Sequence, residues 1–254
     1  MYKLRRHPQV IAHRGYSGAY PENTRSAILG AIEIGADMVE IDVRMSRDGV
    51  PVVFHDSMLA LNPRASRRID EFTAAELKSL NIERVKGPHF RGERILTLDE
   101  ALAIVQNRIP INLDIKTPQA LGPTIRHVQA RHMVDETVLS GCSGAHVRRV
   151  RQEEPQLHVL MNVDDHLRTL LRVFSTRLAL LIFRMQAYIL QPAGLNVSHR
   201  FAADPFIRGA TARNLSVWTW TVDDPLRALE LADLGAVSIT SNRPDRILAA
   251  FPHR

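Results

Sequence analysis

Short apolar segments with β propensity alternate with segments of helical periodicity along the whole chain. Strand–helix alternation predicts a parallel sheet covered by helices, because parallel strands need a long crossover between them. Eight such units in 254 residues predict an α/β protein, a (β/α)8 TIM barrel. The alternative is a doubly wound open sheet, but the first strand is followed by HRGYSG, which lacks the G-x-G-x-x-G phosphate turn. The apolar segments are 10–13, 38–43, 111–116, 137–141, 158–163, 195–198, 216–222 and 236–240.

Boundary signals support the helical segments between these strands. Residues that cap helix N-termini precede several of them, and glycines that end helices precede the next strand. The caps are Asn23-Thr24, Thr97 with Glu100 as a capping box, and Ser143, and the terminating glycines are Gly35 and Gly235.

A ninth apolar run, 51–54, interrupts the alternation after the second strand. Only seven residues separate it from Val43, and Asp48-Gly49 marks a tight turn between them. That is too short for a parallel crossover, so the run is predicted to return antiparallel to the second strand. The hairpin therefore brings His55 back toward Glu40 and Asp42, at the rim where barrel enzymes build their sites.

Residues 56–96 separate this hairpin from the third barrel strand. The segment is polar and contains one helix-like piece, TAAELKSL. We expect a small insertion over the barrel rim rather than a second domain, so that residues 1–254 form one domain.

Three carboxylates are predicted to meet at this rim. Glu40 and Asp42 are two residues apart and share one face of their strand, and Asp114 and Lys116 repeat this spacing on the third strand. Converging acids repel one another, and a hard divalent cation such as Mg²⁺ or Ca²⁺, which prefers oxygen ligands, relieves the repulsion. The alternative is a set of salt bridges to Lys116 and Arg14.

Two histidines flank the predicted acid cluster. His13 ends the first strand and His55 ends the returning one, and imidazoles titrate near neutral pH, which suits general acid and base catalysis. Arg14 and Lys116 are candidates to bind an anionic phosphate. Trp220, near the end of the seventh strand, is a candidate to line a substrate pocket. A packed or solvated role is the alternative for each histidine, and core packing is the alternative for the tryptophan.

The remaining composition restricts the partners. The net charge is +6, but the basic residues are dispersed, with no Lys/Arg run interleaved with aromatics, so nucleic acid is not an expected partner. The single cysteine, Cys142, excludes an internal disulfide. No signal-like or membrane-spanning apolar segment is recognised, and we expect a cytoplasmic protein.

One segment, 167–190, is rich in large apolar residues and arginines and contains no acid. As a basic amphipathic helix it would contact an anionic membrane surface peripherally. The alternative is a long barrel helix packed on the sheet or on a second subunit of a homo-oligomer.

Several motifs together resemble those of the glycerophosphodiester phosphodiesterase family. The HR…ExD…HD series is specific in its order and spacing, and the similarity covers nearly the whole chain, thinning at about 56–95 and 164–192. The motifs are HRG (13–15), PENT (21–24), EID (40–42), DG with VVFHD (48–56), INLDIK (111–116), WTVDD (220–224) and ITSNRPD (239–245).

The resemblance implies a barrel with an inserted subdomain and a divalent metal held by Glu40, Asp42 and Asp114. It also implies His13 and His55 as acid and base, without saying which is which, and phosphate contacts from Arg14 and Lys116. Glu22 in PENT also matches a family position near the site.

The chain departs from the family pattern in three places. Asp114 stands where Glu is usual, and its shorter arm would loosen one metal contact or admit a water. The sequence after His-Asp, MLALNPRASRR, is atypical and bears on substrate preference. WTVD replaces WTVN, which places an acid at Asp223.

These observations predict metal-dependent cleavage of a small phosphodiester, a glycerophosphodiester giving sn-glycerol 3-phosphate and an alcohol. The resemblance implies the glycerol 2-hydroxyl as nucleophile and a cyclic phosphate that water then opens. The alternatives are a lysophospholipase D-like or other lipid or sugar phosphodiesterase, a sphingomyelinase D-like or phosphoinositide-cleaving barrel, a catalytically silent barrel that binds phosphorylated ligands, and a structural protein.

Overall fold

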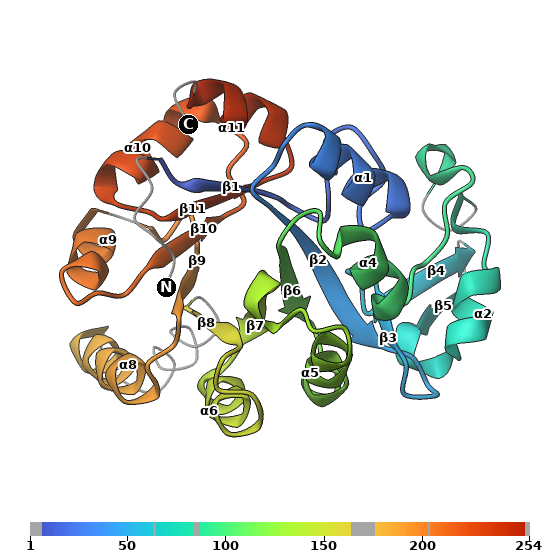
Figure 1. The fold of residues 1–254 in the computed structure, drawn as a ribbon, viewed down its shortest axis with the longest axis horizontal. Coiled ribbons are helices and arrows are strands. Elements are labelled where there is room, and N and C mark those ends of the chain that lie inside the picture. The colour runs from blue at the N-terminus through green and yellow to red at the C-terminus, as the bar shows by residue number, and fades with distance from the viewer. Residues whose placement is uncertain (1–6, 63–64, 84–86, 164–175, 203, 252–254) are drawn as a thin grey trace.

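Eight parallel strands close into a barrel in the computed structural model, which describes residues 7–62, 65–83, 87–163, 176–202 and 204–251 (Figure 1). Each strand pairs with the next in chain order, and β1 pairs with both β2 and β11, so the sheet has no free edge between them. The predicted TIM barrel is therefore confirmed. Its strands are β1 (Gln9–Ala12), β2 (Met38–Met45), β6 (Ile111–Ile115), β7 (Thr137–Cys142), β8 (His158–Asn162), β9 (Gly194–Ser198), β10 (Val217–Trp220) and β11 (Ser238–Ser241).

Helices on the outside of the barrel connect these strands (Figure 1). Thr24 caps the first of them by accepting a hydrogen bond from the Ala27 amide, and Thr97 and Ser143 form capping boxes. Gly235 ends its helix in the left-handed conformation, with φ of 103°. The barrel helices are α1 (Arg25–Glu33), α4 (Leu98–Val105), α5 (Leu121–Ala130), α6 (Gly144–Glu153), α8 (Thr176–Leu190), α9 (Asp204–Thr211), α10 (Pro225–Leu234) and α11 (Pro244–Ala250).

The predicted hairpin after β2 is present. Strand β3 (Pro51–Val53) runs antiparallel to β2, with Val43 opposite Val53, and Gly49 occupies the tight turn with φ of 76°. The amide of Phe54 then donates to the carbonyl of Asp42, at 3.1 Å. This hydrogen bond places the residues after β3 beside Asp42 of β2.

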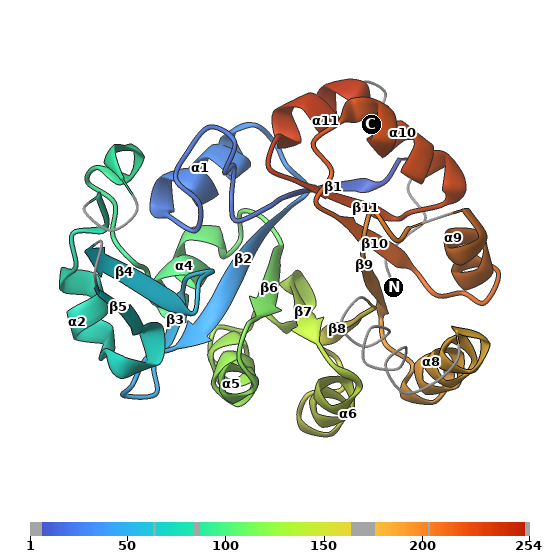
Figure 2. The same cartoon turned by 180° about the vertical axis from the view of Figure 1, so that it is seen from behind.

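The inserted segment forms a small lobe beside α1 and α4 at one side of the barrel (Figures 1 and 2). It contains a two-stranded antiparallel sheet, β4 (Met58–Asn62) and β5 (Ala65–Arg68), and the helix α2 (Ala74–Ser79), which corresponds to the predicted helical piece. The sequence did not predict the two-stranded sheet. The lobe has a hydrophobic cluster of its own, which includes Val52, Phe54, Leu59, Ile69, Phe72, Leu77, Ile82 and Ile95.

Short 3₁₀ turns complete the described elements: η1 (Ile69–Glu71), η2 (Pro88–Phe90), η3 (Pro118–Ala120) and η4 (Val134–Glu136). Turn η2 belongs to the inserted lobe and matters for the site below.

The two faces of the barrel strands have different roles. Outward residues such as Val39, Ile41 and Val43 are fully buried beneath the helices. The inward residues include a compact apolar cluster of Ile11, Met38, Val138, Leu160 and Trp218, which we call the barrel floor. Since side chains alternate along a strand, Met38, Glu40 and Asp42 share the inward face of β2. The acids therefore lie above the floor, toward the carboxyl ends of the strands.

Candidate active site

Neighbouring strands bring the three predicted carboxylates together. In the register of β2 and β6, Glu40 lies opposite Asn112 and Asp42 lies opposite Asp114. One carboxylate oxygen from each of Glu40, Asp42 and Asp114 lies within 4.8 Å of the other two. Glu40 is 4% exposed and Asp42 is fully buried, so this cluster is largely shielded from bulk water.

Two cations contact the same cluster. Lys116 places Nζ 2.9 Å from Asp42 Oδ1 and 2.5 Å from Asp114 Oδ2. The Arg14 guanidinium places Nε 3.3 Å from Asp42 Oδ2, and its Nη1 donates to Glu22 at 2.7 Å. The salt bridges considered as an alternative to a metal site are thus present, and they concentrate on Asp42.

The acids respond differently to this environment. Burial, together with the negative charges of Asp42 and Asp114, raises the pKa of Glu40 well above its usual range. Burial also opposes ionisation of Asp42, but Lys116 and Arg14 outweigh it and lower the pKa of Asp42. Burial would lower the pKa of Lys116, yet Asp114 and Asp42 raise it. Asp42 is therefore compensated by two direct ion pairs, whereas the charge of Lys116 acts on Glu40 too weakly to offset burial and the two neighbouring acids.

The donor set fits a hard divalent cation. Within the described part of the chain, Asp114 Oδ1 is buried and has no hydrogen-bond partner. With Glu22, which also pairs with Arg14, four carboxylates face the two cations Lys116 and Arg14, so two negative charges are uncompensated when all are ionised. Oxygen ligands of this kind suit Mg²⁺ or Ca²⁺, and a cation here would supply the charge that Glu40 lacks.

Asn23 is a site residue whose role the sequence did not reveal. Its Nδ2 donates to Asp42 Oδ2 at 2.7 Å, and its Oδ1 accepts from the Asp42 amide at 3.1 Å. Asn23 adopts a left-handed backbone, with φ of 60°, which asparagine tolerates. Its position beside the helix cap at Thr24 suggested a capping role only, and it instead fixes the rotamer of Asp42.

The two histidines have different surroundings. His13 is largely buried, and its Nε2 lies 3.9 Å from Glu40 Oε2. Burial and the charge of Arg14 lower the pKa of His13. His55 follows β3 and is more exposed, its Nδ1 lies 2.9 Å from Asp56 Oδ1, and its carbonyl accepts from Arg44 Nε.

A pocket of about 590 Å³ opens beside His13 and Arg14. Its lining also includes His89 and Phe90 from turn η2, so the inserted lobe reaches the mouth of the site. The sequence predicted an insertion over the rim but identified neither residue. The other lining residues are Ser17, Tyr20, Glu22 and Asn242.

Comparison with known proteins identifies the family. The model of the glycerophosphoryl diester phosphodiesterase family matches residues 13–246. The chain belongs to this family. A glycerophosphodiester phosphodiesterase of Caldanaerobacter subterraneus is 29% identical, over 94% of this chain and 96% of that protein. A lysophospholipase D of Rattus norvegicus is 24% identical, over 93% of this chain and 84% of that protein.

Solved structures agree with this assignment. A phosphodiesterase of Oleispira antarctica, determined in complex with the product sn-glycerol-3-phosphate, superposes with a TM-score of 0.81. It is 27% identical in sequence, and the match covers 97% of each chain.

The site residues predicted from the sequence do not all gather at one point. Trp220 ends β10, is half-buried, and has a buried Nε1 without a hydrogen-bond partner among the described residues. Neither Trp220 nor His55 belongs to the lining of the 590 Å³ pocket. The sequence-predicted residues that do contact one another are Arg14, Glu40, Asp42, Asp114 and Lys116, with His13 at their edge.

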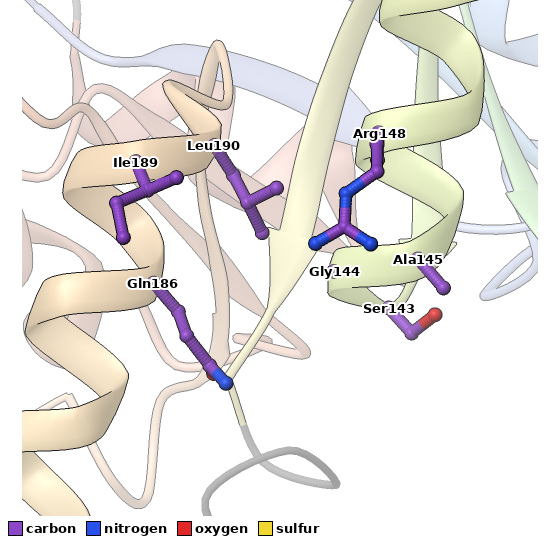
Figure 3. Close-up of a pocket in the computed structure, with 7 residues that line it drawn as sticks. All are labelled: Ser143, Gly144, Ala145, Arg148, Gln186, Ile189 and Leu190. Carbon is purple, nitrogen blue, oxygen red and sulfur yellow. The ribbon is translucent and has the colours of Figure 1, made fainter.

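A second hollow, of about 370 Å³, lies between α6 and α8 on the outside of the barrel (Figure 3). Gln186, Ile189 and Leu190 line it from α8, and Ser143 and Arg148 from α6 and its cap. It shares no residue with the acid cluster. Of the predicted amphipathic segment, α8 covers 176–190, and 167–175 lie outside the described residues. No described helix is long and apolar enough to cross a membrane.

Proposed function

We propose that this member of the family is a metal-dependent phosphodiester hydrolase that converts glycerophosphodiesters to sn-glycerol 3-phosphate and an alcohol. The observation that carries the proposal is the largely buried cluster of Glu40, Asp42 and Asp114 toward the carboxyl ends of two barrel strands, flanked by His13. Family membership and the relatives' names support the same activity.

In this proposal Glu40, Asp42 and Asp114 hold a Mg²⁺ or Ca²⁺ ion. When bound, the cation supplies positive charge that stabilises the phosphate oxygens as charge develops on them. Two hydrogen bonds orient the acids for this cation. Asn23 Nδ2 donates to the Asp42 carboxylate, and the Arg14 amide donates to Glu40 Oε2 at 2.8 Å.

Arg14 and Lys116 bind the substrate phosphate. A guanidinium has five donors, and the contacts to Asp42 and Glu22 employ two of its three nitrogens, which leaves donors for a phosphate oxygen. Lys116 contributes a point charge from the end of β6. Trp220 lines the substrate site from the end of β10.

His13 and His55 move the protons. One accepts the proton of the attacking hydroxyl, the glycerol 2-hydroxyl, as its oxygen bonds to phosphorus and the bond to the leaving alkoxide breaks. The other protonates the leaving oxygen. Attack of water on the resulting cyclic phosphate reverses these proton transfers and yields the monoester.

The test is an assay of purified, chelator-stripped protein with glycerophosphocholine. We expect turnover only after Mg²⁺ or Ca²⁺ is restored, and its loss in His13→Ala. Turnover that persists with chelator would contradict the metal proposal. Absence of cleavage despite measurable metal binding would overturn the substrate assignment.

A lipid phosphodiester is the second candidate substrate. Met185, Tyr188 and Ile189 are exposed on α8, at 55%, 76% and 69%, with Arg148 lining the adjacent hollow. Exposed apolar side chains beside a cation suit an anionic lipid surface, and the rat relative is named a lysophospholipase D.

Sedimentation with anionic phosphatidylglycerol vesicles tests this face. We expect binding that Tyr188→Ala with Ile189→Ala weakens, and faster turnover of a lysophospholipid than of glycerophosphocholine. Dimerisation in light scattering, abolished by the same changes, would instead assign the face to a second copy of the chain.

A further inference from the structure

Asp223 organises the loop that follows β11, although it lies in the loop that follows β10. Its Oδ1 accepts hydrogen bonds from Ser241 Oγ at 2.8 Å and from the Asn242 amide at 2.7 Å. Its Oδ2 accepts from Asn242 Nδ2 at 2.8 Å. Partial burial opposes ionisation, but these hydrogen bonds from Asn242 and Ser241 lower the pKa of Asp223. The side chain is therefore a carboxylate at neutral pH and can only accept.

This carboxylate determines which way the Asn242 amide faces. An amide has one donating and one accepting end. If Asn242 were turned over, its Oδ1 would face Asp223 Oδ2, and two acceptors would meet at 2.8 Å. The Nδ2 end must therefore face Asp223. Ser17 Oγ has one hydrogen, which it shares between the His13 carbonyl at 2.8 Å and Asn242 Oδ1 at 3.0 Å. This shared contact is weaker than the hydrogen bond to the Asp223 carboxylate, which therefore decides the orientation.

The orientation of Asn242 in turn determines the tautomer of His13. Asn242 Oδ1 lies 2.7 Å from His13 Nδ1. Since an amide oxygen only accepts, Nδ1 must carry the hydrogen. In the neutral imidazole the other nitrogen, Nε2, then has a free lone pair, and it is the nitrogen that lies toward Glu40.

We propose that Asp223 and Asn242 are positioning residues that hold neutral His13 in its Nδ1–H tautomer and present Nε2 as the proton acceptor at the acid cluster. His13 is then the group that takes the proton from the attacking hydroxyl, which leaves proton donation to His55. The assignment of these catalytic roles rests on the proposed function, but the tautomer does not.

The Asp223→Asn variant tests this proposal, because the structure predicts that the tautomer of His13 is reversed and not merely that activity is lost. The new amide would keep its oxygen toward Ser241 and the Asn242 amide, and would present NH₂ to Asn242. Asn242 would then turn over and donate to His13 Nδ1, which would move the proton to Nε2. Exchanging the two residues, Asp223→Asn with Asn242→Asp, would restore an acceptor at His13 Nδ1.

The primary measurement is imidazole ¹⁵N NMR of the full, metal-free chain at about pH 8, where neutral histidine dominates. The chain has 11 histidines, and the His13 signals are those lost in His13→Gln. We expect a hydrogen-bearing Nδ1 in the natural protein, a hydrogen-bearing Nε2 in Asp223→Asn, and restoration in the exchanged pair. Hydrogen on Nε2 of the natural protein, or no change in Asp223→Asn, would overturn the proposal.

Kinetics supply the second readout. We expect kcat to fall about 10²-fold in Asp223→Asn, with KM changed less than about twofold, since Asp223 does not line the pocket and the Asn242 side chain keeps its place there. The exchanged pair should recover most of kcat. The control is Asp224→Asn, which removes the same charge one residue later, where Asp224 caps α10. A tautomer reversal in a protein without phosphodiesterase activity would refute the proposed function and leave the Asp223–Asn242 arrangement intact.

Discussion

The floor and the mouth of the barrel are built from the same strands but are stabilised in opposite ways. On β2, Met38 packs into the apolar floor, whereas Glu40 and Asp42, on the same face, lie in the acid cluster. The floor gains stability from each apolar atom removed from water. The mouth loses stability on burial and depends on its partners, because a buried charge without compensation is costly.

Within the mouth the compensation is uneven. Lys116 and Arg14 both contact Asp42, while Glu40 has its nearest cationic candidate in His13 at 3.9 Å. The mouth of the barrel therefore holds one carboxyl group, that of Glu40, whose pKa is raised above its usual range. From the contrast between mouth and floor, we expect substitutions at the mouth to affect activity and the pH dependence of stability. Substitutions at the floor should affect stability alone.

The largest effect on activity is expected from Asp42→Asn. The change removes a metal ligand and leaves Lys116 and Arg14 without their shared partner. Loss of several kcal/mol of charge stabilisation corresponds to a fall in kcat/KM of about 10³-fold or more. Kinetics and metal titration by calorimetry measure it. The control is Asp204→Asn, an exposed member of a surface pair on α9. Retention of metal binding and rate in Asp42→Asn would exclude Asp42 as a ligand.

Leu160→Ala tests the floor. Removing a fully buried leucine is expected to cost about 2–5 kcal/mol in the free energy of unfolding, measured with urea. Activity of the folded variant at 25 °C should remain within about twofold. The matched change on the surface is Leu229→Ala, exposed on α10, with an effect under about 0.5 kcal/mol. A loss of activity without loss of stability would break the distinction between floor and mouth.

Glu40→Gln tests the pH response of the mouth. Because the pKa of Glu40 is raised by folding, the folded state holds this proton more tightly than the unfolded state. The apo protein therefore loses stability as pH rises from about 4.3, the ordinary glutamate value, through the raised pKa. Each unit of the raised pKa corresponds to about 1.4 kcal/mol.

In chelator-treated protein, the difference in unfolding free energy between Glu40→Gln and the natural chain should move in favour of the variant as pH rises. Denaturation midpoints from pH 4.5 to 8 measure this difference. Comparing the two chains also subtracts the contribution of Asp42, whose pKa is shifted in the opposite direction. A constant difference across this range would mean that Glu40 ionises as readily when folded as when unfolded.

The smallest effect is expected from Phe90→Ala at the pocket mouth. Phe90 is half-buried against the lobe. Removing its ring should weaken the binding of a substrate with a bulky alcohol by roughly 1 kcal/mol, which raises KM about fivefold. Glycerophosphocholine compared with a glycerophosphodiester of a smaller alcohol measures the preference. Equal changes for both substrates would mean that the lobe does not contact the alcohol.

Much of this fold was determined by sequence patterns of short range. Alternation of apolar strands and capped helices predicted the barrel, and the seven-residue connection before 51–54 predicted the antiparallel return of His55. The two-residue period of a strand placed Glu40 with Asp42 on one face, and the expected pairing of β2 with β6 brought Asp114 to them. Strand and turn geometry leaves few alternatives for residues that are close in the sequence, so these patterns predict structure without knowledge of the tertiary contacts.

The tertiary structure alone decided which groups complete the site. The partner of His13 is Asn242, 229 positions away, and the direction of the Asn242 amide depends on Asp223 in the loop after β10. Asn23 lies in a loop yet holds Asp42, and His89 and Phe90 reach the pocket from a lobe whose two-stranded sheet has no clear sequence pattern. No local periodicity encodes these contacts, because each depends on how closed strands and loops bring distant side chains within hydrogen-bonding distance.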